Sequence, residues 1–505
     1  MRRHLTSAYA SILPTELLCE ILTLAEDNRK PDAYIPASQV CRRWREVTLD
    51  SPLLWNKVTF PHFSLEKTRE MLRRSKVTPL TVHVDGILHN RSNLAFFNEI
   101  VPHLPRIQQL CITIREHNAI QNHPVALLIL NCSLPNLEIL ELKLHGDPDE
   151  QILFTHPLLG GEGTNLLKHV TLIHFAITWS SSLLRGLSTL FIALPSSNSQ
   201  PSVGELLDIL QACPSITDFT YEVDTPRSAW MRLMVRQTKE VKLAQLKYLS
   251  LDMDYGECTQ LLHHLHMPAI KDFKIRCQRY VIQQPLVVLL RELPYPSQHR
   301  ITCRLSTSTV CVSAITNTMF TVPTSYQGEV EMHWNPPPLR RTPFHILIKL
   351  IQSPSFPSAS TTTFDLILES WADKALWIQL LGFLPNVRHL RLTVNENCTI
   401  SMMEDFLDAL TASNESETHI RHMQVLPQLL TLEFDGSFPE HRRLADKLYD
   451  FAQVRRDCDT PLRVLRLWKP ETVPLAYISN LQIVIDEVTA GSTRSHSGDP
   501  AVMSE

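Results

Sequence analysis

The sequence predicts an α/β protein in which a small all-α N-terminal domain precedes an irregular α/β solenoid. Helical patterns fill the first sixty residues, and helix and strand patterns alternate from Ser64 onward. A template with apolar residues at positions 1, 4, 6 and 8 then recurs along the chain. An apolar residue followed by proline stands just before six of its copies. Successive copies start 20 to 30 residues apart between Ile107 and Ile270, which is typical of repeat arrays.

The bulk composition limits the classes of partner. The 48 basic and 52 acidic residues give a net charge of −4, so no field of one sign attracts nucleic acid or anionic lipid. Glycine is scarce, at 13 of 505 residues, and glycine-rich phosphate loops are therefore not expected. At about 150 residues per domain, the length fits roughly three units or one elongated array. We expect no nucleic-acid partner.

Apolar runs and cysteines indicate the compartment. No run approaches the ~18 residues of a membrane helix, and the apolar part of Met1 to Pro14 is too short for a signal peptide. The 11 cysteines are odd in number and include no C-x-x-C pair, which favours buried free thiols in a reducing compartment. We expect an intracellular protein, cytoplasmic and/or nuclear, that binds no membrane.

The first helical pattern runs from Ile12 to Glu26. Pro14 fits the first turn of a helix, and Glu16 lies near the positive helix end. The apolar residues share one predicted stripe, namely Leu17, Leu18, Ile21, Leu22 and Ala25. We predict an amphipathic helix whose apolar face needs a partner.

A second helix is predicted after a polar connector, with Pro36 at its start. Its apolar residues recur at i, i+1, i+4, i+7 and i+8, namely Val40, Cys41, Trp44, Val47 and Thr48. Three arginines lie off this stripe, namely Arg42, Arg43 and Arg45. They predict a solvated face rather than a nucleic-acid patch, and Trp44 would contact whatever the helix packs on.

Residues Ile12 to Val58 resemble the F-box in content and order. The segment contains Leu-Pro-x-Glu-Leu-Leu-x-x-Ile, then Val-Cys-x-x-Trp and then Ser-Pro-Leu-Leu-Trp. The resemblance implies docking to a Skp-type adaptor protein and, through it, to a cullin. The residues that match the motif and would bind the adaptor are Leu13, Pro14, Glu16, Leu17, Ile21, Val40, Cys41 and Trp44.

Periodicity alone leaves a second interpretation open, a plain helical hairpin packed on the first repeat. A domain of about 45 residues buries little apolar area, however, and usually needs a partner surface.

The repeat template fits seven segments in full and three in part. The copies start at Ile107, Leu137, Leu167, Leu187, Ile216, Leu246, Ile270, Val387, Leu429 and Leu462. Helices are expected between the strands, with Ser64 as the N-cap of one of them. Two more are marked by the capping-box patterns Ser202-x-x-Glu205 and Ser401-x-x-Glu404.

The array resembles a divergent leucine-rich repeat, L-x-x-L-x-L, and its combination with an N-terminal F-box is similar to F-box proteins of fungi. The repeat family expects asparagine at position 9, where only Asn395 conforms, and the template is lost after Gln278. We predict a flexible N-terminus at residues 1–10, an F-box-like helical domain at 11–60, a leucine-rich-repeat-like solenoid at 61–490 with a degenerate stretch at 278–383, and a disordered tail at 491–505.

Residues that alternate with the buried ones would point outward from a shared sheet. Solenoids bind partners with that face, and its mixed charges suggest a protein ligand. The predicted target-binding residues are Glu222, Asp252, Lys274, Arg276, Arg391, Glu433 and Trp468, and other outward positions are Glu141, Lys143, Asp435 and Arg466. A merely solvated strand face is the alternative interpretation.

Clusters of chemically active residues are few. Cys258 and three histidines lie between Cys258 and Met267, but on a helix the thiol joins the apolar stripe and the imidazoles spread apart, so we expect no metal site. The glycines of Gly160–Thr164 lack the lysine of a phosphate loop and predict an ordinary loop. No motif of a hydrolase or protease is present, and neither catalytic residues nor cofactors are expected.

The function implied by the resemblance is that of a substrate-recognition subunit of an SCF-type (Skp-cullin-F-box) E3 ubiquitin ligase. The F-box would bind the adaptor and the repeats would bind the target protein, without chemistry in this chain. One alternative is a non-catalytic leucine-rich-repeat scaffold that acts outside the ligase. A hydrolase between residues 278 and 384 is a third hypothesis, based only on the loss of the repeat there.

Overall fold

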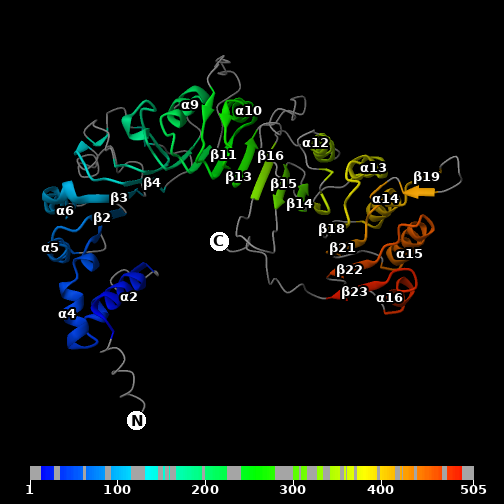
Figure 1. Cartoon of the computed structure of the whole chain (residues 1–505), viewed down its shortest axis with the longest axis horizontal. Helices are drawn as coiled ribbons and strands as arrows, with labels where there is room; N and C mark the ends of the chain where they lie inside the picture. Colours follow the sequence, from blue (N-terminus) through cyan, green and yellow to red (C-terminus); the bar gives the residue numbers. More distant parts are fainter. Residues whose placement is uncertain are drawn as a thin grey trace, which may run out of the picture. The chain divides into compact units, whose positions relative to one another are not determined.

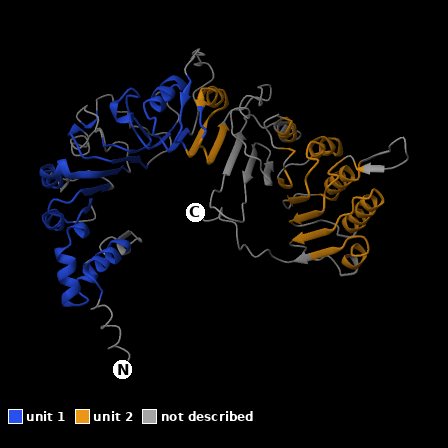
Figure 2. Cartoon of the chain, viewed as in Figure 1, with its two compact units in different colours: residues 1–246, 266–268 blue, residues 247–265, 269–505 orange. Residues whose placement is uncertain are grey.

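The chain forms two units that each contain helices and a sheet of mostly parallel strands. Unit 1 comprises residues 1–246 and 266–268, and unit 2 comprises residues 247–265 and 269–505 (Figure 2). The computed structural model describes residues 13–27, 34–60, 64–85, 92–114, 131–145, 152–153, 158–159, 166–195, 200–223, 240–278, 300–305, 309–315, 327–333, 342–352, 358–359, 361–368, 372–394, 399–415, 421–423, 425–436, 441–468 and 475–491.

The first helical elements among the described residues of unit 1 are α2 (Thr15–Asp27), α3 (Tyr34–Ala37), α4 (Arg42–Asp50) and the 3-10 helix η1 (Pro52–Trp55). Helix α2 packs against α4 and η1. The prediction that Pro36 opens the second long helix is wrong, because Pro36 lies inside the short α3. Cys41 has an extended backbone and its thiol accepts the N–H of Trp44, so α4 starts at Arg42 and Val40 lies outside it.

In the described part of unit 1, seven strands form the main sheet. They are all parallel and neighbour one another in chain order. These strands are β1 (Lys57–Phe60), β2 (Leu80–Asp85), β3 (Ile107–Ile114), β4 (Ile139–Leu144), β6 (His169–Ile173), β8 (Thr189–Leu194) and β9 (Asp218–Val223). The helices between them are α5 (Leu65–Arg74), α6 (Ser92–Ile100), η2 (Val101–Arg106), η4 (Ser182–Leu184) and α9 (Val203–Gln211). Shorter strands are β5 (Ile152–Leu153), β7 (Phe175–Ala176) and β10 (Val241–Lys242).

Among the residues that the structure describes in unit 2, ten strands form the main sheet, in the spatial order β11-β13-β16-β15-β14-β17-β18-β21-β22-β23. They are β11 (Tyr248–Asp254), β13 (Asp272–Gln278), β14 (Arg300–Leu305), β15 (Thr309–Ile315), β16 (Gln327–His333), β17 (Thr363–Leu368), β18 (His389–Val394), β21 (Thr431–Asp435), β22 (Val464–Trp468) and β23 (Glu487–Gly491). Strand β15 runs antiparallel to both of its neighbours. Strands β14 to β16 lie in the stretch where the template is lost.

Helices cover one face of the unit 2 sheet (Figure 1). Neighbouring helices in the series α12 to α16 pack against one another, and an aromatic chain lies beneath them. The ring centroid of Trp377 lies 5.0 Å from that of Phe344 and 4.9 Å from that of Phe406, and both pairs are edge to face. The helices are α10 (Tyr255–His263), α12 (Thr342–Ile351), α13 (Lys374–Gly382), α14 (Ile400–Leu410), α15 (His441–Asp457) and α16 (Leu475–Leu481). Further short strands are β12 (Leu265–His266), β19 (Ser413–Glu415) and β20 (Arg421–Met423).

The apolar template residues form the cores of both units, and each of them is at most 8% exposed. Neighbouring parallel strands align these residues at equal template positions. One such row in unit 1 is Leu110, Leu140, Val170, Leu190 and Phe219. One in unit 2 is Leu390, Leu432 and Leu465, and Phe364 of the neighbouring β17 extends it. The period-two burial of these strands follows directly from the spacing of the template.

Main-chain hydrogen bonds connect the turns just before successive strands, at template position 2. The N–H of Glu138 donates to the carbonyl of Gln108 at 2.8 Å, and the N–H of Lys168 donates to that of Glu138 at 2.9 Å. The same contact recurs in unit 2 between Arg463 and Leu430, at 2.9 Å. The backbone of each turn is therefore satisfied in part by the backbone of the next turn.

Three predictions about helix ends have different outcomes. Ser64 caps α5 as predicted, and the capping box of Ser202 and Glu205 is complete at α9. The predicted capping box at Ser401 is wrong, because α14 begins at Ile400 with Thr399 as its N-cap. Cys258 is fully buried on α10, as predicted, although this helix ends at His263 and does not reach Leu265.

Among the described residues, none of the helices combines the length and the apolar content needed to cross a bilayer. The predicted loop at Gly160–Thr164, the N-terminus at 1–10 and the tail beyond Gly491 lie outside the described residues, and Gly491 itself ends β23.

Candidate protein-docking surfaces

Helix α2 presents apolar side chains in two directions. Leu18 and Leu22 are buried toward the neighbouring helices, at 0% and 4% exposure. Leu17, Ile21 and Leu24 are 46%, 45% and 58% exposed. Their i, i+4, i+7 spacing places them on one side of the helix, which we call the α2 stripe. Burial within the chain therefore satisfies only part of the apolar surface of this helix.

Two further exposed apolar residues flank helix α4. Val40, just before it, is 60% exposed, and Leu53, just after it in η1, is 59% exposed. Cys41 is exposed as well, whereas Trp44 is half-buried. Monomeric proteins rarely expose several large apolar side chains on one short segment unless that surface binds a partner.

The start of α2 is held by a contact that the sequence pattern did not predict. The guanidinium of Arg43 donates to the carbonyl of Leu13, so Arg43 is half-buried rather than fully solvated. Arg42 and Arg45 are exposed, as predicted, and Arg42 pairs with Glu46 at 3.0 Å. Of the remaining residues predicted to bind the adaptor, Leu13 is half-buried, and Pro14 and Glu16 are exposed.

The helices are anchored to the sheet through Trp55. Its indole N–H donates to the carbonyl of Thr48 at 2.8 Å, and the guanidinium of Arg74 lies 4.5 Å from its ring centroid. Two residues after η1 the chain enters β1, where Val58 lies opposite Val82 of β2. The exposed apolar residues thus sit on helices with a rigid support.

Residues 10–61 match the F-box-like family model. This match covers α2 to β1 and supports an F-box protein. F-box-like domains are adaptor modules, and in general they imply binding to a Skp-type adaptor. The F-box-like domain therefore contains the α2 stripe, Val40 and Leu53.

Comparisons with curated proteins and with solved structures gave two further findings. No curated protein matches the chain. Among solved structures, the chain is similar to one titled "Crystal structure of TLR13-ssRNA13 complex", with 14% sequence identity and a TM-score of 0.33. That similarity covers 84% of this chain and 50% of the other, so the chain spans about half the length of that structure.

A second candidate surface lies on the helix-free side of strands β17, β18, β21 and β22. Four charged residues there share one register row and alternate in sign, namely Asp365, Arg391, Glu433 and Arg466. Arg391 contacts Asp435 at 2.5 Å through Nη2 and lies 3.8 Å from Glu433 through Nε. The indole N–H of Trp468 donates to the same Glu433 carboxylate. Three predicted target-binding residues, Arg391, Glu433 and Trp468, are therefore brought together.

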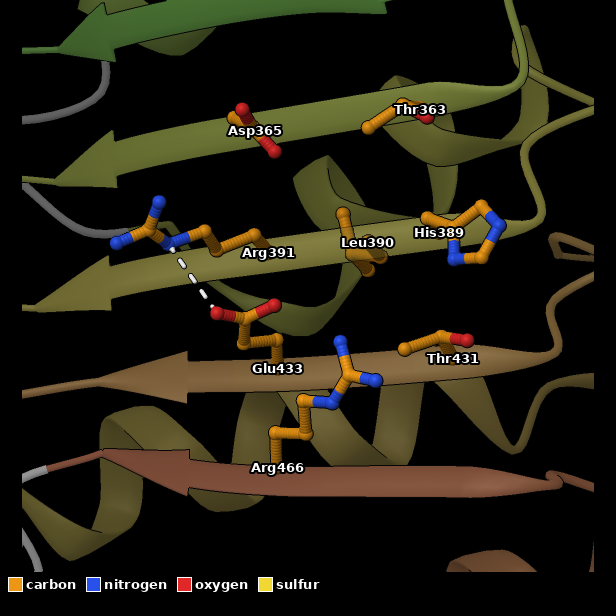
Figure 3. A pocket seen from close by; sticks show the side chains of 8 residues that line it. All are labelled: Thr363, Asp365, His389, Leu390, Arg391, Thr431, Glu433 and Arg466. Carbon is orange, nitrogen blue, oxygen red and sulfur yellow. Dashed lines mark ion pairs between the residues drawn. The ribbon is translucent and has the colours of Figure 1, made fainter. Parts of the chain in front are cut away.

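A polar cavity of about 160 Å³ opens on this surface (Figure 3). Burial lowers the pKa of His389 below its usual value, and the nearby charges of Arg466 and Arg388 lower it further. The imidazole is therefore predominantly neutral at pH 7. The cavity is lined by Thr363, Asp365, His389, Leu390, Arg391, Thr431, Glu433 and Arg466.

The other predicted target-binding residues lie elsewhere. Arg276 on β13 pairs with Asp252 on β11 at 3.2 Å, and Lys274 is exposed on β13. Glu222 is half-buried on β9 in unit 1 and joins neither cluster. These residues are thus divided among separate places on the strands.

Sequence reasoning missed one row of the cavity. Thr363, His389 and Thr431 lie in register on neighbouring strands, and His389 and Thr431 occupy template position 3. The prediction considered only outward positions 5 and 7. Extending the same alternation one step toward the start of each strand finds this row.

The corresponding face of unit 1 carries a smaller polar group. Lys143 pairs with Glu141 at 2.6 Å, and the thiol of Cys111 donates to the same carboxylate at 3.2 Å. Burial, followed by the charge of Glu141, raises the pKa of the Cys111 thiol to about 12. This thiol is therefore unreactive at neutral pH.

Proposed function

We propose that this chain is the substrate-recognition subunit of an SCF-type E3 ubiquitin ligase. The α2 stripe supports the proposal most strongly, because it exposes three large apolar residues within an F-box-like domain. Full burial of such a side chain contributes roughly 1.5–3 kcal/mol, so these residues would act as anchors in an adaptor contact.

The proposed adaptor surface comprises the residues that match the F-box motif together with two that the structure adds. Leu24 continues the α2 stripe by one turn, and Leu53 is as exposed as Val40. The full set is Leu13, Pro14, Glu16, Leu17, Ile21, Leu24, Val40, Cys41, Trp44 and Leu53.

The remainder of the chain, as a leucine-rich-repeat-like solenoid over residues 61–490, would select the target protein. The alternating charges on β17 to β22 support this role, because such a surface discriminates among partners by charge complementarity. The chain would perform no chemistry. Its contribution would be proximity, which raises the effective concentration of the target near the ubiquitin-transfer machinery.

Adaptor capture tests the proposal. We expect a Leu17→Glu, Ile21→Glu double variant of the full chain to bind a purified Skp-type adaptor at least about a hundredfold more weakly than wild type, because two apolar anchors are lost. Val77→Glu is the matched control, since Val77 is a 90% exposed apolar residue of unit 1 outside the F-box-like domain. Circular dichroism would show that both variants stay folded.

Three outcomes distinguish a ligase subunit from a scaffold that acts outside the ligase. Capture of adaptor and cullin by wild type, but not by the double variant, supports the ligase subunit. If wild type and the double variant bind the adaptor equally well, the result contradicts the role of the α2 stripe in adaptor binding. Adaptor capture that excludes cullin would favour the scaffold outside the ligase.

A further inference from the structure

We propose that the polar cavity on β17 to β22 binds a single carboxylate, supplied by a glutamate or aspartate side chain of the target protein. This assignment rests on the proposed target-selecting role of the sheet, and it adds the chemical class of the residue that is recognised.

Most charges around the cavity already satisfy one another. Arg391 contacts Asp435 at 2.5 Å and lies near Glu433. Glu433 in turn accepts the indole N–H of Trp468. These four residues form a network that holds Arg391 and Glu433 in place along the wall of the cavity. Arg391 Nε has no hydrogen-bond partner in the described part of the chain, but it is buried.

Arg466 is different. It follows Glu433 in the register row, and Figure 3 shows its guanidinium group extending from β22 across β21. Within the described part of the chain, no hydrogen bond or ion pair involves Arg466. The planar guanidinium group presents parallel N–H donors whose geometry matches the two oxygens of a carboxylate. Its donors are thus available for an acidic group from outside.

The neighbouring row adds polar groups beside this cation. Thr363, His389 and Thr431 lie in register on three adjacent strands and line the same cavity. Both hydroxyl groups and a neutral imidazole N–H can donate to an oxygen. A carboxylate that binds Arg466 would therefore find further donors close by.

The charge balance favours one carboxylate over a phosphate group. Two arginines and two carboxylates line the cavity, so their charges cancel. A phosphate carries close to two negative charges and would meet the carboxylates of Asp365 and Glu433 without a net positive field. A carboxylate carries one charge, which one unpaired guanidinium can balance.

The surroundings favour a side chain over a chain end. Outward residues line the cavity toward the strand starts, at Thr363 and His389, and continue beyond it toward the strand ends, at Asp435 and Trp468. A target segment that runs along these strands can therefore insert one side chain into the cavity.

Titration of the full chain with small probes tests the assignment without the adaptor. The probes are N-acetylglutamate α-amide, its glutamine analogue, N-acetylglycine and inorganic phosphate, each at constant ionic strength. The readout is the ring resonance of His389 in protein with labelled histidines, identified by its loss in His389→Gln. We expect saturable shifts with the glutamate probe and none with the glutamine analogue.

Variants localise the site. Arg466→Met should weaken binding of the glutamate probe at least about tenfold, because a charge-assisted bidentate contact is lost. Arg466→Lys should give an intermediate affinity, since lysine keeps the positive charge but lacks the parallel N–H donors of the planar guanidinium group. Arg463→Met is the matched control, because Arg463 is exposed and lies outside the cavity lining.

Specific results would overturn the proposal. They are the absence of any saturable shift with the glutamate probe, equal binding by Arg466→Met and wild type, tighter binding of phosphate, or tighter binding of N-acetylglycine, which would indicate a chain end. Adaptor capture is measured separately, so its failure leaves this titration interpretable and the two proposals can fail independently.

Discussion

At the scale of single residues, Arg455 shows how hydrogen bonds to backbone carbonyls stabilise a buried cation. This side chain of α15 is fully buried and donates through Nη2 to the carbonyls of Leu426 at 3.1 Å and Leu429 at 3.3 Å. Its Nε donates to the carbonyl of Thr460 at 3.0 Å. Burial lowers the pKa of Arg455 to about 10, which still leaves it charged at pH 7. Leu426 has a left-handed backbone, with φ of 46°, so the guanidinium group stabilises a strained turn.

We expect Arg455→Met to lower the free energy of unfolding by about 3 kcal/mol, because several buried carbonyls lose their donor at a cost of roughly 1–3 kcal/mol each. The midpoint of urea denaturation measures this loss. Arg463→Met, at an exposed position, should leave the midpoint unchanged. A shift as small as that of the control would mean that water or relaxation replaces the guanidinium group.

His389 gives stability a dependence on pH. Its pKa in the folded chain lies below the ordinary value of 6.5, first because of burial and then because of Arg466 and Arg388. Below pH 6.5 the unfolded chain therefore binds more protons than the folded chain at this residue, and stability falls as the pH falls toward the folded pKa. Urea midpoints at pH 8 and pH 5.5 should differ more for wild type than for His389→Gln. Equal differences would contradict the lowered pKa.

At the scale of elements, two helices with the same sequence pattern start differently. Ser202 precedes α9 and accepts the N–H of Glu205 at 3.2 Å, while the Glu205 carboxylate accepts the N–H of Ser202 at 2.8 Å. In α14 the extended backbone of Thr399 places the helix start earlier, so Ser401 lies inside the first turn. The Ser-x-x-Glu pattern alone does not distinguish the two cases.

Paired alanine variants test this difference. Ser202→Ala should cost about 1 kcal/mol of stability through the lost cap. Ser401→Ala should be neutral, because its side chain is exposed within a helix and alanine has the higher helix propensity. Denaturant midpoints of the two variants provide the comparison. A loss at position 401 equal to that at position 202 would indicate that Ser401 is the cap after all.

The buried half of each strand was predictable because apolar alternation reports burial directly. Leu390 and Leu392, for example, are both at template positions and both buried. Strand direction was not predictable, since an antiparallel strand such as β15 has the same alternation as a parallel one. The cavity depends on which strands are neighbours and on where their charges find partners. Periodicity therefore located Arg391 and Glu433 but could not show that Arg466 has no hydrogen-bond or ion-pair partner in the described part of the chain.

At the scale of the whole molecule, the F-box-like domain is continuous with the first sheet. Strand β1 falls inside the family match and pairs with β2 beyond it. Trp55 is likewise covered by Arg74, which lies on α5 after the match ends. The domain therefore depends on neighbouring residues for part of its packing.

A fragment that ends at residue 61 should consequently be much less stable than a fragment that ends at residue 246. It leaves β1 without its partner strand and exposes Trp55. Thermal melts followed by circular dichroism would show a broad, low transition for the short fragment and a cooperative one for the long fragment. Equal melting temperatures would show that the F-box-like domain folds alone.

Strands β13 and β16 are neighbours in the sheet of unit 2 but are synthesised at different times. Strand β13 ends at Gln278, and the strand that pairs with its far edge, β16, begins at Gln327, so the 48 residues from 279 to 326 must be made in between. At roughly 5–20 residues per second, that edge stays open for several seconds as the chain leaves the ribosome. An unpaired strand edge is a template for wrong pairing, so this interval is when the nascent protein most needs protection from aggregation.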